Sequence, residues 1–185
     1  VSMEPVQPGF NYFDTSLPLE SMIVDGSVRL RSGQGTWAPF ELWGAGVEDL
    51  TLTGESFWTF TEGEPLEITW LAPTSVGRGE IHLGVNIDQH GTSPTTLYCT
   101  FPDTGSAILP ADMIEGLFEA GVTGWPVGSV RRRTADRADV GEGCVDLVVS
   151  SFESVDVVVS GYVPCDNAHP CPDGMECNYE IELCE

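Results

Sequence analysis

The residues that most directly suggest chemistry are Asp103, Thr104, Gly105 and Ser106, which form the motif of aspartic proteases. Such enzymes need two carboxylates that share one proton, and the chain has no second Asp-Thr-Gly or Asp-Ser-Gly, so a second subunit would have to supply the partner. Pro102 removes a backbone donor beside Asp103, and a Pro-Asp-Thr-Gly turn between a strand and a short helix accounts for the same residues. We therefore predict a turn at Asp103, and an aspartic-protease-like function ranks third among the functions considered.

Acidic loop residues are candidates for calcium binding. Hard oxygen ligands hold Ca²⁺, and the segments NIDQHG and TADRADVGEG place carboxylates in loops. Neither segment has the spacing of an EF-hand loop, and acidic turns facing solvent are the alternative interpretation. The candidate ligands are Asp88, Asp136, Asp139 and Glu142.

The histidines and serines show no zinc-binding or catalytic spacing. His82, His90 and His169 are predicted in a strand, a turn and the C-terminal tail, without a His-x-x-x-His pair or a Cys-x-x-Cys partner. The Gly-x-Ser-x-Gly motif of serine hydrolases is absent. The sequence therefore predicts a non-enzymatic protein with no cofactor other than the candidate Ca²⁺.

These residues are set in a chain of short predicted β-strands. From residue 27 onward, nine apolar stretches end mostly at Gly, Pro, Asp, Glu or Ser, which predicts an all-β sandwich. One short helix is expected, with Pro110 at its first position and Gly121 at its end. The alternation is clearest where four apolar residues share one face: Ile81, Leu83, Val85 and Ile87.

Three segments divide the chain: an extended arm over 1–26, the sandwich over 27–164 and a Cys-rich module over 165–185. The arm contains three prolines and little periodicity, so it is expected to be extended. Its apolar side chains need a surface to pack on, either on their own domain or on a neighbouring copy. The candidate interface residues of the arm are Phe10, Tyr12, Phe13, Leu17 and Leu19.

The tryptophans are interpreted as core residues, with a carbohydrate-stacking platform as the alternative. Four of the five, Trp37, Trp43, Trp58 and Trp70, lie in the first half of the chain. In the stretch FWTF, Phe57 and Trp58 fall on opposite faces of a strand, so part of this aromatic surface must be covered by more than one sheet.

The charge distribution excludes several classes of partner. The chain has 29 acidic residues, 7 arginines and no lysine, giving a net charge of −22, which argues against nucleic acids and anionic membranes. No apolar run is long enough for membrane insertion. Four arginines fall in VRRRTADR, where they either pair with the chain's own carboxylates or dock onto an acidic face of another copy. They are Arg131, Arg132, Arg133 and Arg137.

The six cysteines indicate an oxidising compartment, and we expect three disulfides. Four of them, Cys165, Cys171, Cys177 and Cys184, follow C-x5-C-x5-C-x6-C, which is typical of a two-disulfide module and allows three pairings. Similarity to the crossed pairing of EGF-like modules favours Cys165–Cys177 and Cys171–Cys184. Cys99 and Cys144 then remain to pair with each other.

The stretches EPLEITW, TTLYCTFPDTGSAILPADMIEGL and CVDLVVSSFESVDVVVSGY resemble the β-sandwich of secreted myxobacterial surface proteins. The Cys-rich tail is similar to short modules that recur in those exported proteins. The resemblance covers residues 64–163 and implies an immunoglobulin-like or jelly-roll-type sandwich in a secreted or cell-surface protein, but it implies no activity.

Together these features predict a non-enzymatic extracellular structural or adhesive protein. We expect a subunit of a surface fibre or layer that self-associates when the N-terminal arm pairs with a neighbour's sheet edge. The alternative is a monomeric sandwich that binds a glycan through the tryptophans or Ca²⁺ through the acidic loops.

Overall fold

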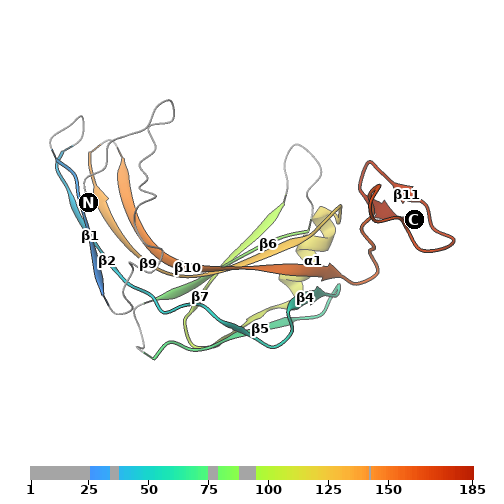
Figure 1. Ribbon diagram of the computed structural model, residues 1–185, viewed down its shortest axis with the longest axis horizontal. Coiled ribbons are helices and arrows are strands. Elements are labelled where there is room, and N and C mark those ends of the chain that lie inside the picture. Colours follow the sequence, from blue (N-terminus) through green and yellow to red (C-terminus); the bar gives the residue numbers. More distant parts are fainter. Residues whose placement is uncertain (1–25, 34–37, 75–78, 88–94, 142) are drawn as a thin grey trace.

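The computed structural model describes residues 26–33, 38–74, 79–87, 95–141 and 143–185. Within these ranges the chain forms twelve β-strands and one α-helix, which confirms the predicted all-β fold (Figure 1). No helix of the described ranges is long and apolar enough to cross a membrane. The interface residues predicted in the arm, from Phe10 to Leu19, lie outside the described residues.

A five-stranded sheet is the larger layer of the fold. Its order is β4-β10-β9-β6-β7, and every neighbouring pair is antiparallel except β4 and β10, which are parallel. Buried and partly exposed residues alternate along β6, as expected for a sheet with one face in the core and one towards water. The strands are β4 (Phe57–Phe60), β6 (Glu80–Asn86), β7 (Thr96–Pro102), β9 (Val127–Asp139) and β10 (Cys144–Val159).

A three-stranded sheet covers the inner face of this layer and lies below it in Figure 1. Its order is β3-β5-β8, with β3 at Leu52–Thr53, β5 at Leu66–Trp70 and β8 at Ser106–Leu109. Side chains from both sheets and from the helix form one core, so the predicted sandwich is confirmed. The core residues with no exposed surface include Phe60, Val85, Leu109, Ile114 and Val130.

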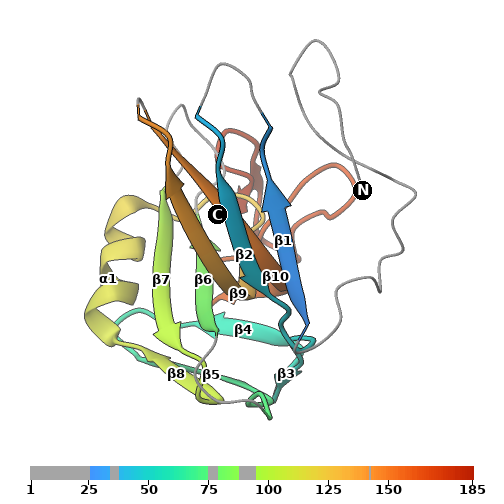
Figure 2. The same cartoon turned by 90° about the vertical axis from the view of Figure 1, so that its left-hand side faces the viewer.

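The single described helix, α1 (Ala111–Ala120), lies beside β7 at one edge of the sandwich (Figure 2). It follows β8 directly and buries Ile114 and Leu117, which are three residues apart and share one helix face. Pro110 is the N-cap residue and lies just before the helix, whereas the sequence predicted it at the first helical position. Gly121 ends the helix as predicted, because its φ of 115° lies in the region that favours glycine.

A hairpin of β1 (Ser27–Arg31) and β2 (Glu41–Ala45) packs on the far half of the long β9–β10 hairpin. Two hydrogen bonds join the layers: Trp43 N donates to Asp136 Oδ2 at 2.8 Å, and Thr134 Oγ1 donates to Ala45 O at 2.7 Å. Gly44 lets the strands approach closely, because a Cβ at this position would collide with Val149. Strands β9 and β10 bend strongly, with β1–β2 and the three-stranded sheet on the convex side (Figure 1).

The C-terminal segment packs against the end of the sandwich where β10 leaves it (Figure 1). It contains two short strands, β11 (Cys177–Asn178) and β12 (Leu183–Cys184). Leu183 belongs to the sandwich core, and Gly124 N donates to Ile181 O at 2.8 Å. The Cys-rich module is therefore attached to the sandwich by apolar packing as well as by the chain.

Candidate functional site

Asp103 lies in the turn between β7 and β8, and its side chain is an internal ion-pair partner. The predicted turn is confirmed, although it leads to β8 and not directly to the helix. Arg132 Nε donates to Asp103 Oδ2 at 2.7 Å, and Arg132 Nη2 donates to Oδ1 at 3.2 Å. Trp70 Nε1 also donates to Oδ1, at 2.7 Å. The side chains of Arg132 and Asp103 are only 2% and 3% exposed.

The guanidinium of Arg132 has acceptors for all five of its N–H donors. Besides Asp103, it donates from Nη2 to Leu71 O at 2.6 Å and from Nη1 to Asp49 O at 3.0 Å and Glu48 O at 3.3 Å. The ion pair thus ties β9 to the ends of β5 and β7 and to the segment before β3. A protease dyad needs a second carboxylate at Asp103, whereas the partners found here are a guanidinium and an indole.

The arginines of β9 pair mostly with the chain's own carboxylates. Arg133 donates twice to Glu80 Oε1, at 3.0 and 3.1 Å, and Arg137 donates to both oxygens of Asp146, at 2.6 and 2.8 Å. Hydrogen bonds from His82 and Arg133 lower the pKa of Glu80, and Arg137 lowers that of Asp146. Of the two alternatives drawn from the sequence, pairing with the chain's own carboxylates therefore holds for Arg132, Arg133 and Arg137, and the buried Arg132 cannot belong to a docking surface.

Arg131 differs from the other three arginines. Within the described residues no carboxylate forms an ion pair with it, and its guanidinium stacks on Phe152 with 5.4 Å from Cζ to the ring centroid. Both residues lie on the solvent-exposed face of the five-stranded sheet, called here the outer face. The outer face is the concave side of the bent sheet in Figure 1, because the packed layers lie on the convex side.

Tyr98 is the most exposed aromatic residue of the outer face. Its side chain is on β7, 81% exposed, and its ring lies against Gly84 of the neighbouring β6, where a Cβ would be 3.3 Å from Tyr98 Cε1. The glycine therefore leaves room for one edge of the Tyr98 ring beside β6. Polar side chains surround it, including His82, whose Nε2 is 2.6 Å from Glu80 Oε1.

One edge of β10 is unpaired over most of its length. Within the described residues, β4 pairs only with Asp156–Val159, and no strand pairs with Cys144–Val155 on the side away from β9. Ser151 Oγ accepts a hydrogen bond from Leu50 N at 2.9 Å, but this contact uses the side chain and leaves the backbone edge unused. We call Cys144–Val155 the open edge.

A cleft of about 460 Å³ lies where β10 leaves the sandwich and the Cys-rich module begins. We call it the junction cleft. Its walls are mostly apolar, and Asp156 is the charged residue among those that line it. Its lining includes Trp125, Val127, Asp156, Val158, Tyr162 and Pro164.

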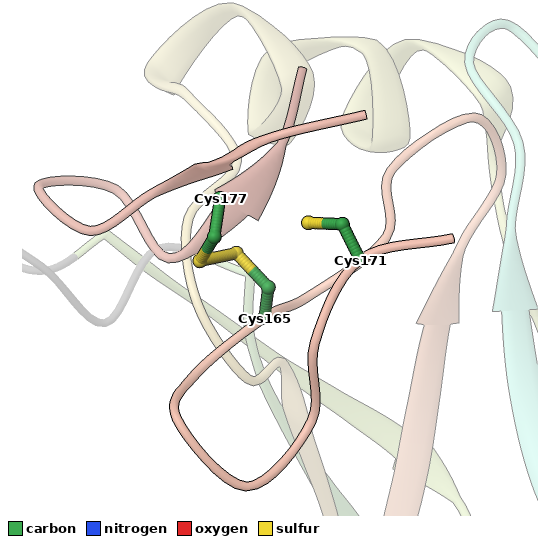
Figure 3. A group of neighbouring side chains, drawn as sticks. All are labelled: Cys165, Cys171 and Cys177. Atoms are coloured by element: carbon green, nitrogen blue, oxygen red, sulfur yellow. A yellow bond between two sulfur atoms is a disulfide. The ribbon is translucent and has the colours of Figure 1, made fainter. Parts of the chain in front are cut away.

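The module's cysteines form two disulfides, Cys165–Cys177 and Cys171–Cys184, the pairing favoured from the sequence. The sulfur atoms of Cys165, Cys171 and Cys177 lie within 4.8 Å of one another (Figure 3). Cysteines oxidised in this way do not offer thiolates to a metal ion. The two disulfides indicate an oxidising environment such as the extracellular space.

The predicted Cys99–Cys144 disulfide is wrong, since both cysteines are free. Cys99 is opposite Leu83 and Leu83 is opposite Val130, whereas Cys144 is opposite Asp139, nine residues further along β9. Nine residues of strand span about 30 Å, far beyond the reach of a disulfide. The amino-acid sequence does not show how far apart along their strands the two cysteines lie.

The candidate calcium ligands do not converge in the described residues. Asp136 and Asp139 are three apart on β9, so strand alternation places them on opposite faces. Their oxygens accept backbone hydrogen bonds, Asp136 from Trp43 and Arg137, and Asp139 from Gly141. Asp88 and Glu142 lie outside the described residues.

The tryptophans divide between core and surface. Trp58 and Trp70 are buried, which confirms the core interpretation for these two residues. Trp43 is exposed and stacks with Arg29, 4.8 Å from Cζ to the ring centroid, and Trp125 lines the junction cleft. Trp37 lies outside the described residues.

Comparison of the chain with family models and with curated proteins finds no match. The open edge, the outer face and the junction cleft are the features of the described residues that bear on function.

Proposed function

We propose that the protein is a secreted, non-enzymatic structural and adhesive protein that assembles when a strand of one copy is added to the open edge of the next. The observation that supports this most strongly is the length of the open edge. It runs for twelve residues, from Cys144 to Val155, and along it about every second residue points its backbone N–H and C=O away from β9, where no described strand pairs with them. An exposed strand edge of this kind is a template for pairing with another chain.

The sequence of the open edge lacks two of the features that usually block such pairing, although it carries the charged side chains of Asp146 and Glu153. It contains neither proline nor lysine, and its outward side chains include the exposed Val148 and Phe152. The N-terminal arm, with its five aromatic and leucine residues between Phe10 and Leu19, is the donor that we propose. A contact between an arm and an edge joins two different surfaces and need not form a closed ring of subunits, so a fibre or layer would follow.

The test is the molar mass of the full chain, measured by light scattering as the protein concentration rises. Because each copy carries a charge of −22, salt of at least about 0.15 M is needed to screen repulsion. We expect concentration-dependent association that is lost in a chain truncated before Ser21 and in the double variant Val148→Lys, Phe152→Lys. Thr100→Lys, on the outer face but away from the open edge, is the matched control. A full-length protein that stays monomeric would contradict the proposal.

A second candidate function, glycan binding, is favoured by the Tyr98 ring, which is 81% exposed beside Gly84. Exposed aromatic rings stack on apolar sugar faces, and Arg131 offers N–H donors to hydroxyl groups. A neutral glycan is favoured over an anionic one because of the net charge. Retardation of the protein in gels that contain neutral polysaccharides, lost in Tyr98→Ala, would support this function; equal mobility of both proteins would exclude it.

A further inference from the structure

The junction cleft presents aromatic rings that are exposed yet fixed. Trp125 and Tyr162 are 38% and 40% exposed. The Trp125 ring packs edge-on against His169, with 4.9 Å between centroids, and the Tyr162 ring against Phe118, with 6.0 Å. Rings held in this way lose little conformational entropy when a ligand binds, so the cleft is preorganised.

The lining favours an uncharged apolar ligand of a few residues. A volume of about 460 Å³ falls within the range of ordinary ligand sites. Val127 and Val158 add apolar surface that is 51% and 48% exposed. Asp156 offers a single carboxylate, which can accept a hydrogen bond but would repel an acidic segment.

The chain itself contains a segment of matching chemistry, outside the described residues. Residues 5–13, PVQPGFNYF, form an uncharged run between Glu4 and Asp14. Pro5 and Pro8 are three residues apart, which is the period of the polyproline II helix, so both rings would lie on one side, about 9 Å apart. Grooves lined with aromatic residues recognise proline-bearing segments of this kind.

We propose that the junction cleft binds Pro5–Pro8 from the N-terminal arm of a neighbouring copy and so sets the register of that arm on the open edge. This inference rests on the proposed assembly. Nine residues without proline, Gly9–Leu17, follow the docked segment and match in number the nine residues Leu147–Val155 of the open edge. The arm would run antiparallel to β10, starting from the cleft.

Chain length permits this arrangement. Eighteen residues lie between Pro8 and Ser27, where β1 begins, and they can span about 60 Å. The distance along β10 from the junction cleft to Leu147, nine residues, is about 30 Å. The connection to β1 is therefore long enough for the arm to reach the cleft of a neighbouring copy, and isotope labelling distinguishes this from binding within one copy.

The experiment places a photo-reactive residue in the arm of the full chain by Val6→p-benzoylphenylalanine. Equal amounts of ¹⁴N- and ¹⁵N-labelled protein are mixed, assembled and irradiated, and the cross-linked peptides are identified by mass spectrometry. We expect cross-links from position 6 to peptides containing Trp125–Val127 or Val158–Tyr162, with one peptide of each isotope. Cross-links that join only peptides of the same isotope show the arm in its own cleft and overturn the proposal.

Full-chain variants provide an independent measurement. Val158→Glu, which adds a second carboxylate beside Asp156, is expected to raise the concentration for half-association about tenfold, whereas Thr100→Glu leaves it unchanged. Pro5→Ala with Pro8→Ala is expected to raise it about 4- to 30-fold by loosening the free arm. Assembly with cross-links outside the cleft, or unchanged association in Val158→Glu, overturns the cleft inference but leaves strand addition standing. A monomer at every concentration overturns both.

Discussion

Replacing Asp103 by Asn would leave the buried guanidinium of Arg132 without a counter-ion. The change keeps the size of the side chain, so the effect reports on charge and not on packing. An amide oxygen can accept from Trp70 or from Arg132, but the amide nitrogen would face one of the N–H donors that now point at the carboxylate. Breaking a buried ion pair from one side typically costs about 3–5 kcal/mol.

A loss of this size is a large share of the stability of an ordinary domain, about 5–15 kcal/mol. For a chain of 185 residues it corresponds to a fall in the melting midpoint of about 6–20 °C. The assay is thermal and urea unfolding followed by circular dichroism. Arg137→Gln is the control, because it breaks an ion pair of similar geometry with exposed partners and is expected to leave the midpoint unchanged. If Asp103→Asn has the same melting midpoint as the parent protein, the conclusion that the Asp103–Arg132 ion pair stabilises the fold is refuted.

Three further predictions concern the free cysteines, the two disulfides and Glu80. Thiol labelling without reduction should find two free cysteines, with Cys144 labelled at once and Cys99 more slowly, because burial raises the pKa of the Cys99 thiol. If neither cysteine is labelled in the unfolded, unreduced chain, the structure is contradicted. Reducing the two disulfides, each worth about 3 kcal/mol, should release the module and expose Leu183, which proteolysis would detect as early cleavage after residue 164. His82 and Arg133 lower the pKa of Glu80, so the ionised Glu80 stabilises the fold above the pKa of about 4.3 that it has in the unfolded chain. This contribution is lost as the pH falls through the lower pKa of the folded state. Urea titrations from pH 6 to pH 3 should therefore show a smaller fall in the free energy of unfolding for Glu80→Gln than for the parent protein.

Strand positions and the helix could be predicted because their signals are local. The alternation from Ile81 to Ile87 and the apolar stripe of Ile114 and Leu117 depend only on neighbouring residues, and both are buried as expected. The turn at Asp103 follows from the same local chemistry.

The partners of charged and sulfur-bearing side chains could not be predicted, because they depend on which strands become neighbours. Arg132 shares the inner face of β9 with Val130, two residues away, and this parity was the one signal that it points into the core. Its acceptor Asp103 lies 29 residues earlier in the chain. The distance between Cys99 and Cys144 likewise depends on strand order.

The most direct test of the assembly account is hydrogen exchange of the amides in Cys144–Val155, measured at low and high protein concentration. Amides that pair with β9 should be protected under both conditions, because those bonds belong to the folded chain. We predict that the remaining amides exchange rapidly when the protein is dilute and become protected when it is concentrated, while β9 and β6 remain unchanged. Equal exchange of the open edge at every concentration would contradict strand addition.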